Sequence, residues 1–348
     1  MGTLFLGLLL FTPLTIGAEY AGVSPVILFF LSAVAIIPLA KYIGEATEEL
    51  ATRTSPALGG LLNATFGNAT ELIIGLLALN AGLVEVVKAS ITGSIIGNLL
   101  LVLGLAMFAG GWKREKQTFN QTAILASGST LLLGVIALVI PAIFFVTAPE
   151  IGQGIVEDLS IAVSGVLLLV YAASLFFSLH THKHLYTEEV GKLEARWSVM
   201  RSMTTLLIAT LAVAWISDIL VNSINPLVEQ FGWSQLFIGV IFVAIIGNAA
   251  EHVSALTTAL KNRMDLSLQI SIGSATQIAM LVAPLLVIAS LFFATQMSLV
   301  FNMFELVAMV LSVIIVNFIV ADGESHWLEG VQLLAAYAIM AVAFFFHP

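Results

Sequence analysis

GNATELI at residues 67–73 and GNAAEHV at residues 247–253 are two copies of one short segment, and four of their seven positions are identical. The two copies lie 180 positions apart. The same offset, without a gap, aligns Gly93-Ser94 with Gly273-Ser274 in the neighbouring stretch of each copy. Because the matches continue at constant spacing beyond the copied segment, the sequence predicts an internal repeat.

The sequence around both copies is strongly apolar. Of the 348 residues, 59% are hydrophobic and 9% are charged, whereas about 25% of the residues of a soluble domain are charged. The mean hydropathy is +1.07 and the formal net charge is −9. This composition excludes a soluble enzyme, a disordered chain and a nucleic-acid-binding protein, and it indicates that lipid is the main solvent. The absence of cysteine excludes disulfides and thiolate metal sites.

Apolar runs of about 20 residues are typical of membrane-spanning helices, and the chain has eleven of them. They cover residues 3–18, 24–43, 57–79, 86–110, 119–146, 153–180, 201–222, 234–260, 266–293, 298–320 and 328–346. The first run lacks the basic residues and the cleavage site of a signal peptide, so we interpret it as a helix. We therefore expect an all-α integral membrane protein with about eleven transmembrane helices.

The positively charged residues predict how these helices are oriented. With the N-terminus in the cytoplasm, eleven of the twelve Lys and Arg residues lie on the cytoplasmic side, and Lys88 is the exception. The outer connections carry acidic residues instead, namely Glu19, Glu85, Glu150, Glu157, Asp158 and Glu229. Such a rim raises the local concentration of cations, although ordinary loop charge explains any single one of these acids equally well. We expect a protein of the cell membrane with a cytoplasmic N-terminus.

The repeat divides the chain into four parts. An extra N-terminal helix is expected in residues 1–20, two five-helix halves in residues 21–180 and 201–348, and a cytoplasmic connection in residues 181–200. Because five is odd, corresponding helices of the two halves cross the membrane in opposite directions. Inverted repeats of this kind are typical of secondary transporters, whose substrate site lies near the bilayer midplane where the halves meet.

The connection between the halves has two interpretations. Its histidines either chelate a transition metal or lie at the membrane interface, and its acidic residues form either an accessory cation site or a solvated helix. The residues concerned are His180, His182, His184, Glu188, Glu189 and Glu194.

Glu71 and Glu251 occupy equivalent positions of the two copies, about fifteen and about seventeen residues into their helices. At a rise of about 1.5 Å per residue, both lie well inside the hydrocarbon. A single carboxylate there costs on the order of 3 kcal/mol, so two of them imply a compensating partner. Hydrogen bonding between helices is a poor explanation, because Asn or Ser would serve that purpose without the charge.

The neighbours of both glutamates supply oxygen atoms. Asn68 and Asn248 precede the glutamates by three residues, on about the same helix face. Gly67 and Gly247 permit close helix approach and a local break that frees carbonyl oxygens. The paired helices contain Ser94 and Asn98 in one half, and Ser274 and Gln277 in the other. About six to eight oxygen ligands suit Ca²⁺, whereas Mg²⁺ sheds water reluctantly and transition metals prefer nitrogen or sulfur.

A pair of carboxylates also explains how a proton replaces the metal. Two carboxylates neutralise one divalent cation, and after the cation leaves, desolvation and mutual repulsion favour protonation. Competition between Ca²⁺ and H⁺ for one pair, combined with alternating access, is antiport. This mechanism needs no cofactor and no separate proton pathway.

Four further residues have two interpretations each. His252 either modulates the protonation of Glu251 or only donates a hydrogen bond to it. Glu305, about eight residues or 12 Å into its helix, belongs to the cation route or pairs across the helix bundle. Ser94 and Ser274 either pack helices together or bind the ion.

With these motifs, the sequence resembles the calcium/proton exchangers, a branch of the calcium/cation antiporter superfamily. GNATELI and GNAAEH are similar to the two signature regions of that family, and GSIIGN and GSATQI to their partner segments. The resemblance extends over essentially the whole chain. It implies that Glu71 and Glu251 are the shared ligands of Ca²⁺ and H⁺, and that Asn68, Asn248, Asn98 and Gln277 line the site. It also implies a transporter rather than an enzyme, with Ca²⁺, H⁺ and lipid as its partners. Because the sequence shows no long segment outside the membrane, we expect no obligate protein partner, and the oligomeric state stays open.

Sodium/calcium exchangers of the same fold are the nearest alternative. They typically carry hydroxyl residues where this chain has Asn before the Glu, and further acids where it has Asn98 and Gln277, so we favour proton coupling. A divalent cation channel would also use acidic residues, but it does not need inverted halves. An intramembrane metalloprotease would need a second histidine at helical spacing, and no H-E-x-x-H occurs.

Overall fold

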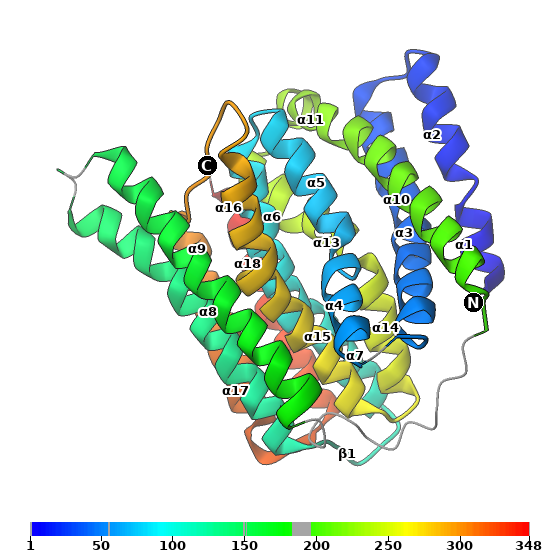
Figure 1. Ribbon diagram of the computed structural model, residues 1–348, viewed down its shortest axis with the longest axis vertical. Coiled ribbons are helices and arrows are strands. Elements are labelled where there is room, and N and C mark those ends of the chain that lie inside the picture. Colours follow the sequence, from blue (N-terminus) through cyan, green and yellow to red (C-terminus); the bar gives the residue numbers. More distant parts are fainter. Residues whose placement is uncertain (1, 55, 149, 151, 183–195, 348) are drawn as a thin grey trace.

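The computed structural model describes residues 2–54, 56–148, 150, 152–182 and 196–347, and it is almost entirely helical (Figure 1). The elements are α1 (Gly2–Leu8), α2 (Phe11–Tyr20), α3 (Pro25–Ala51), α4 (Pro56–Phe66), α5 (Ala69–Asn80), α6 (Val84–Ile96), η1 (Gly97–Val102), α7 (Leu103–Gly111), β1 (Gln117–Thr118), α8 (Gln121–Thr147), α9 (Gln153–Phe176), η2 (Phe177–Thr181), α10 (Val199–Asn222), α11 (Ile224–Phe231), α12 (Gln235–Phe237), η4 (Ile238–Val243), α13 (Ala244–Gly247), α14 (Ala249–Leu260), α15 (Met264–Gln277), η5 (Ile278–Val282), α16 (Ala283–Ser290), α17 (Met303–Ile319), η6 (Val320–Asp322), β2 (Glu324–Ser325) and α18 (Trp327–Phe346). The η elements are π-helical, except η6, which is a 3₁₀ helix.

The helices have the length and composition of a membrane protein, as expected. Among the described residues, eight helices are long and apolar enough to cross a membrane. The helical segments Gln235–Gly247 and Ala249–Leu260, bent by 61° at Asn248, make a ninth span when they are counted together. Shorter apolar helices occupy residues 5–20 and 69–80. Each of the eleven expected runs thus coincides with one helix or with consecutive helices.

Three expected runs differ in detail from the structure. The second, expected to end at residue 43, continues to Ala51 in α3. The first is interrupted by a turn between α1 and α2, because Pro13 has no N–H group to continue the helical hydrogen bonds to Leu9. The tenth was expected from residue 298, but α17 begins at Met303. Asn302 caps α17, and its backbone N–H donates to Glu305. This reciprocal pair of hydrogen bonds defines the start of the helix.

The segment before α17 is non-helical and yet deeply placed. Met297, Leu299 and Phe301 are buried, and the backbone N–H of Leu299 donates to the hydroxyl of Ser160 at 3.0 Å. The carbonyl of Val300 accepts a hydrogen bond of 2.8 Å from Lys88. Side chains of other helices therefore satisfy backbone groups that lack helical partners, as a buried non-helical segment requires.

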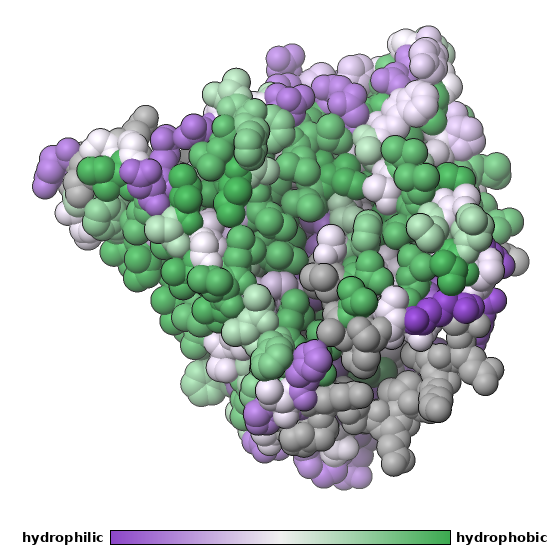
Figure 2. Space-filling view, in the orientation of Figure 1, coloured by the Kyte–Doolittle hydropathy of each residue, from purple (hydrophilic) through white to green (hydrophobic). Residues whose placement is uncertain are grey.

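The helices surround two central spans. Of the residues in the most apolar part of each span, 83% are buried in Val84–Gly111 and 67% in Met264–Ser290, against 17% in Trp327–Phe346. In Figure 1, α3 and α10 lie side by side at one side of the molecule, and α8, α9 and α17 lie at the other. Figure 2 shows an apolar band between hydrophilic side chains at the upper and lower ends of the molecule, as expected for a protein embedded in lipid.

Both copied segments interrupt a helix, as the glycines predict. The helix α4 ends at Phe66 and α5 restarts after Asn68, while α13 ends at Gly247 and α14 restarts after Asn248. The two asparagines have nearly the same backbone angles, with φ −106° and ψ 22° for Asn68 and φ −93° and ψ 15° for Asn248. The repeat is therefore present in the backbone as well as in the sequence.

The paired central spans contain a second common feature. The α6 helix passes into the π-helical segment η1 at Gly97, and α15 passes into the π-helical segment η5 at Ile278. Given the offset of 180 positions, these segments are equivalent. A π-helical turn widens the helix and is frequent at functional sites, and here it coincides with Asn98 in one half and directly follows Gln277 in the other.

Gly93 allows the first central span to pack closely against the second half, and this predicts a test. A methyl group at residue 93 would overlap the backbone of Val240 in η4, whereas a methyl group at the equivalent Gly273 would meet no atom within 4 Å. Gly93→Ala is therefore expected to destabilise the protein by about 1–3 kcal/mol, and Gly273→Ala is not. The melting temperatures of the purified proteins in detergent measure the difference, and equal values for the two variants would contradict this packing.

Candidate cation-binding site

Glu71 and Glu251 have the same local environment in their helices. Each is the third residue of a helix that restarts after a break, Glu71 in α5 and Glu251 in α14. The first turn of a helix carries free N–H groups and a partial positive charge, which favour a carboxylate there. The sequence Gly-Asn, which breaks the helix, thus places each glutamate at a helix N-terminus inside the molecule.

The structure brings Glu71 into contact with the break of the other half. A methyl group built on Gly247 would lie 3.0 Å from Cγ and 3.6 Å from Oε1 of Glu71. The carboxylates of Glu71 and Glu251 are close enough to repel each other when both are ionised. The two glutamates, 180 positions apart in the sequence, are therefore brought near each other, with Glu71 against the helix break that precedes Glu251.

Hydrogen bonds between amide side chains join the two breaks to the central spans. Asn98 donates to Oδ1 of Asn248 at 2.9 Å and to Oγ of Ser274 at 3.0 Å, and Asn248 donates to Oγ of Ser94 at 2.8 Å. On the other side of the pseudo-symmetric arrangement, Asn68 donates to Oε1 of Gln277. The asparagine at each break thus pairs with the amide residue on the central span of the opposite half.

Three oxygen atoms remain without a donor in this network. Among the described residues, no hydrogen-bond partner exists for Oε1 and Oε2 of Glu71 or for Oδ1 of Asn98, although all three atoms are buried. A buried polar atom without a partner costs about 1–3 kcal/mol, and more when it is charged. Because the N–H groups of Asn98 are used by Asn248 and Ser274, the atom left over is an oxygen. Unpaired carboxylate and amide oxygens suit a hard cation such as Ca²⁺.

The two serines and His252 have different places in this arrangement. Ser94 and Ser274 are buried members of the amide network and form hydrogen bonds with Asn248 or Asn98. His252 follows Glu251 directly, about 100° further around the helix. In the part of the chain that the structure describes, no three residues of the types His, Cys, Asp and Glu come together as a metal-binding group.

Comparison with known proteins identifies the family. A family model described as sodium/calcium exchanger protein matches residues 24–180 and, separately, residues 201–346. The chain belongs to the sodium/calcium exchanger protein family. The two matches together cover most of the chain and coincide closely with the expected halves.

Within this family, the chain is most informatively compared with three proteins. It is 47% identical to a Ca(2+)/H(+) antiporter from Aphanothece halophytica, over 99% of this chain and 97% of the relative. It is 51% identical to the Ca(2+)/H(+) antiporter ChaA from Bacillus subtilis, over 92% of each. The solved structure of native YfkE is 46% identical to this chain and superposes on it with a TM-score of 0.88. The match covers 99% of this chain and 100% of YfkE. The expected resemblance to calcium/proton exchangers is thereby confirmed.

In this member of the family, Glu305 does not join the glutamate pair. Its Oε1 accepts a hydrogen bond of 3.0 Å from Thr92, and its Oε2 accepts one of 3.0 Å from the backbone of Asn302. Thr92 lies two residues before Ser94, hence about 200° around α6 from the face that carries the amide network. Glu305 was expected eight residues into its helix, but it is the third residue of α17. This geometry favours the interpretation that Glu305 pairs across the bundle.

The connection between the halves is described only in part. Residues 183–195, with His184, Glu188, Glu189 and Glu194, lie outside the described residues. The rings of His180 and His182 stack on Phe176 and Phe177, with centroids 5.3 Å and 4.0 Å apart. Stacking on aromatic rings at the end of a span is typical of residues at the membrane interface.

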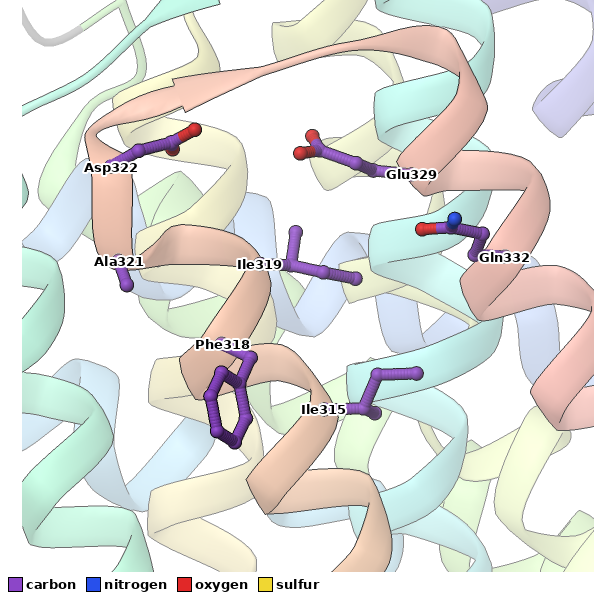
Figure 3. A pocket seen from close by; sticks show the side chains of 7 residues that line it. All are labelled: Ile315, Phe318, Ile319, Ala321, Asp322, Glu329 and Gln332. Atoms are coloured by element: carbon purple, nitrogen blue, oxygen red, sulfur yellow. The ribbon is translucent and has the colours of Figure 1, made fainter.

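A cavity of about 440 Å³ lies apart from the amide network, between α17 and α18. In Figure 3 the carboxylates of Asp322 and Glu329 point towards each other across its polar end, above Ile319 and Ile315. Both acids already accept backbone hydrogen bonds, Asp322 from Glu324 and Glu329 from His326. They therefore act first as local capping groups of the turn between the two helices.

Tyr171 is a neighbour of the site that the sequence analysis missed. It belongs to α9, its side chain is buried, and its hydroxyl interacts with the side chain of Gln277. The motif containing Gln277 is marked by the repeat, whereas nothing in the sequence of α9 distinguishes Tyr171 from other interior aromatic residues. Only the packing of α9 against η5 and α16 places it there.

The position of Glu305 predicts that its role is structural. Glu305→Ala removes the acceptor of Thr92, half of the helix cap and a negative charge near the buried Lys88. We expect a lower melting temperature by several degrees, corresponding to about 1–3 kcal/mol, and less than a twofold change in the Ca²⁺ concentration that half-saturates binding. Glu229→Ala at an exposed position of α11 serves as the control. Weakened Ca²⁺ binding without a change in stability would instead assign Glu305 to the cation route.

Proposed function

We propose that the chain is a secondary active antiporter that exchanges Ca²⁺ for H⁺ across the cell membrane by alternating access. One observation carries the proposal: the buried carboxylate oxygens of Glu71 have no hydrogen-bond donor among the described residues and lie near the carboxylate of Glu251. Relatives that are 47% and 51% identical and are named Ca(2+)/H(+) antiporters support it.

The chemistry of the site residues supports different roles for them. Glu71, Glu251 and Oδ1 of Asn98 would contact the cation directly, because the oxygens of Glu71 and Asn98 have no other partner. Asn248 uses its oxygen to accept hydrogen bonds from Asn98 and Ser274, so it would hold the frame of the site. Asn68 and Gln277 would line the opposite side.

The exchange follows from electrostatic compensation. With Ca²⁺ bound, the two carboxylates are neutralised; without it, they repel each other in a region of low dielectric constant until protons bind. The empty, doubly charged pair is too costly to enclose in the interior. Only the Ca²⁺-bound and the protonated forms would then pass between the two access states, and this restriction couples the two fluxes.

The organisation of the chain supports alternating access. The two separate matches of the family model support the halves 21–180 and 201–348, with residues 1–20 as an additional helical segment. Equivalent helix breaks and equivalent π-helical segments support a common origin of the halves. With five spans in each half, the halves would be inverted relative to each other, and the basic residues favour a cytoplasmic N-terminus.

Sodium coupling is the alternative, since the matching family model is named after sodium/calcium exchange. Several sodium ions need several negatively charged ligands. The central spans supply neutral amides, Asn98 and Gln277, and these amides bond to the asparagines at the breaks. A site with two acids has the charge to hold one divalent cation, which favours protons as the exchanged ions.

The proposed coupling predicts the direction of transport in membrane vesicles. In inside-out vesicles, an acidic lumen drives H⁺ outwards through the protein, and Ca²⁺ is expected to accumulate in the lumen against its gradient. Uptake of ⁴⁵Ca²⁺ measures this, with vesicles that lack the protein as the control. Uptake that ignores the proton gradient and follows a sodium gradient would overturn proton coupling, and uptake only down the Ca²⁺ gradient would indicate a channel.

The shared-ligand mechanism predicts the effect of neutralising either glutamate. Glu71→Gln and Glu251→Gln keep the size of the side chain but remove the charge and the titratable group, so each is expected to reduce exchange to background. Glu229→Gln, at an exposed position of α11, should leave exchange unchanged. Monodisperse elution in detergent shows that each variant still folds, and a folded variant that retains full exchange would remove its glutamate from the mechanism.

A further inference from the structure

Tyr171 has an unusual position for a residue of the outer helix α9. In the most apolar part of the span that contains α9, 22% of the residues are buried, so most of its residues are not in the core. Tyr171, by contrast, is 6% exposed, and Leu167, one helical turn earlier, is 1% exposed. The two residues form the inward face of α9, which packs against η5 and α16. Tyr171 therefore extends from a peripheral helix towards the central span that carries Gln277.

The hydroxyl of Tyr171 lies at Gln277 without a completed hydrogen bond. The two side chains interact, but within the described structure the buried hydroxyl has no partner of hydrogen-bond geometry. A buried tyrosine normally places its hydroxyl against a polar partner, and leaving it unpaired costs about 1–3 kcal/mol. Gln277 is the neighbour that can supply the missing hydrogen bond.

The amide of Gln277 has one oxygen and one NH₂ group, and the two ends have different uses. Its oxygen accepts a hydrogen bond from Asn68, next to the break that carries Glu71. The NH₂ group is a donor and needs an acceptor, and a hydroxyl oxygen is one. If the amide turned round, the NH₂ group would face Asn68 and the glutamates, where a donor repels a cation.

We propose that Tyr171 is a positioning residue of the cation site, whose hydroxyl accepts a hydrogen bond from the NH₂ group of Gln277 and so keeps the amide oxygen directed towards Asn68 and the bound cation. The inference rests on the proposed function, because it concerns the same site. In the cation-bound protein the hydrogen bond between Tyr171 and Gln277 is complete. Tyr171 then contributes to cation affinity without contacting the cation.

Removal of the hydroxyl tests this role. Tyr171→Phe is expected to raise the Ca²⁺ concentration for half-maximal uptake about five- to tenfold, as for loss of one hydrogen bond, with a maximal rate changed less than twofold. Tyr337→Phe is the matched control, because the hydroxyl of Tyr337 on α18 is also buried without a partner in the described structure and Tyr337 belongs to no part of the proposed site. The Ca²⁺ concentration for half-maximal uptake by the Tyr337→Phe variant should equal that of the unchanged protein.

A second readout does not depend on transport. Ca²⁺ raises the melting temperature of a protein that binds it only in the folded state. In detergent, the Tyr171→Phe variant should therefore need a higher Ca²⁺ concentration than the unchanged protein to reach the same rise in melting temperature. Melting temperatures without Ca²⁺ report any general loss of stability. In the Gln277→Ala background, Tyr171→Phe should have no further effect on Ca²⁺ affinity, since its partner is absent.

The outcomes separate this inference from the proposed function. If the unchanged protein shows no proton-driven Ca²⁺ uptake, the proposed function fails. If it does show uptake, but Tyr171→Phe has the same Ca²⁺ affinity as Tyr337→Phe, only the role of Tyr171 is overturned. Additive effects of Tyr171→Phe and Gln277→Ala would equally overturn it, because independent effects exclude action through Gln277.

Discussion

The carboxylate of Glu71, buried without a hydrogen-bond donor in the described structure and beside a second carboxylate, is the constraint on which the rest of the site depends. Water solvates an exposed carboxylate, but at this depth the protein itself or a bound ion has to replace that solvation. The helix N-termini of α5 and α14 provide part of it. The remainder is left for a cation or a proton, and for this reason we propose that the pair is a binding site instead of a structural contact.

The amide network orients the oxygen atoms of the proposed cation site. An amide side chain has a donor end and an acceptor end of similar size. Asn98 uses its donor end on Asn248 and Ser274, and Asn68 uses a donor on Gln277. Because each of these bonds crosses from one half to the other, the orientation of the amide oxygens depends on how the halves are arranged. A change in that arrangement would therefore reorient the oxygens that we propose as cation ligands.

Within the central spans, the repeat symmetry does not include every face. On another face of α6, Lys88 and Thr92 interact with Val300 and Glu305. The equivalent positions of α15 are Leu268 and Ile272, which are apolar and fully buried. At these positions, polar contacts hold α6 against the segment before α17 and the start of α17, whereas α15 packs through apolar side chains. The proposed site is duplicated in the two halves, whereas these neighbouring contacts are not.

The sequence by itself determined the membrane fold, the repeat and the broken helices, because hydrophobic length, the spacing of identical residues and Gly-Asn pairs act locally or by simple offset. It also marked Glu71 and Glu251, since a charge in an apolar run requires compensation wherever it folds. Only the tertiary structure decided which amides pair, that Glu305 caps α17 on another face of α6, and that Tyr171 reaches Gln277. These contacts join residues of different helices, and the position of a helix in the bundle depends on the packing of all its neighbours and not on its own residues.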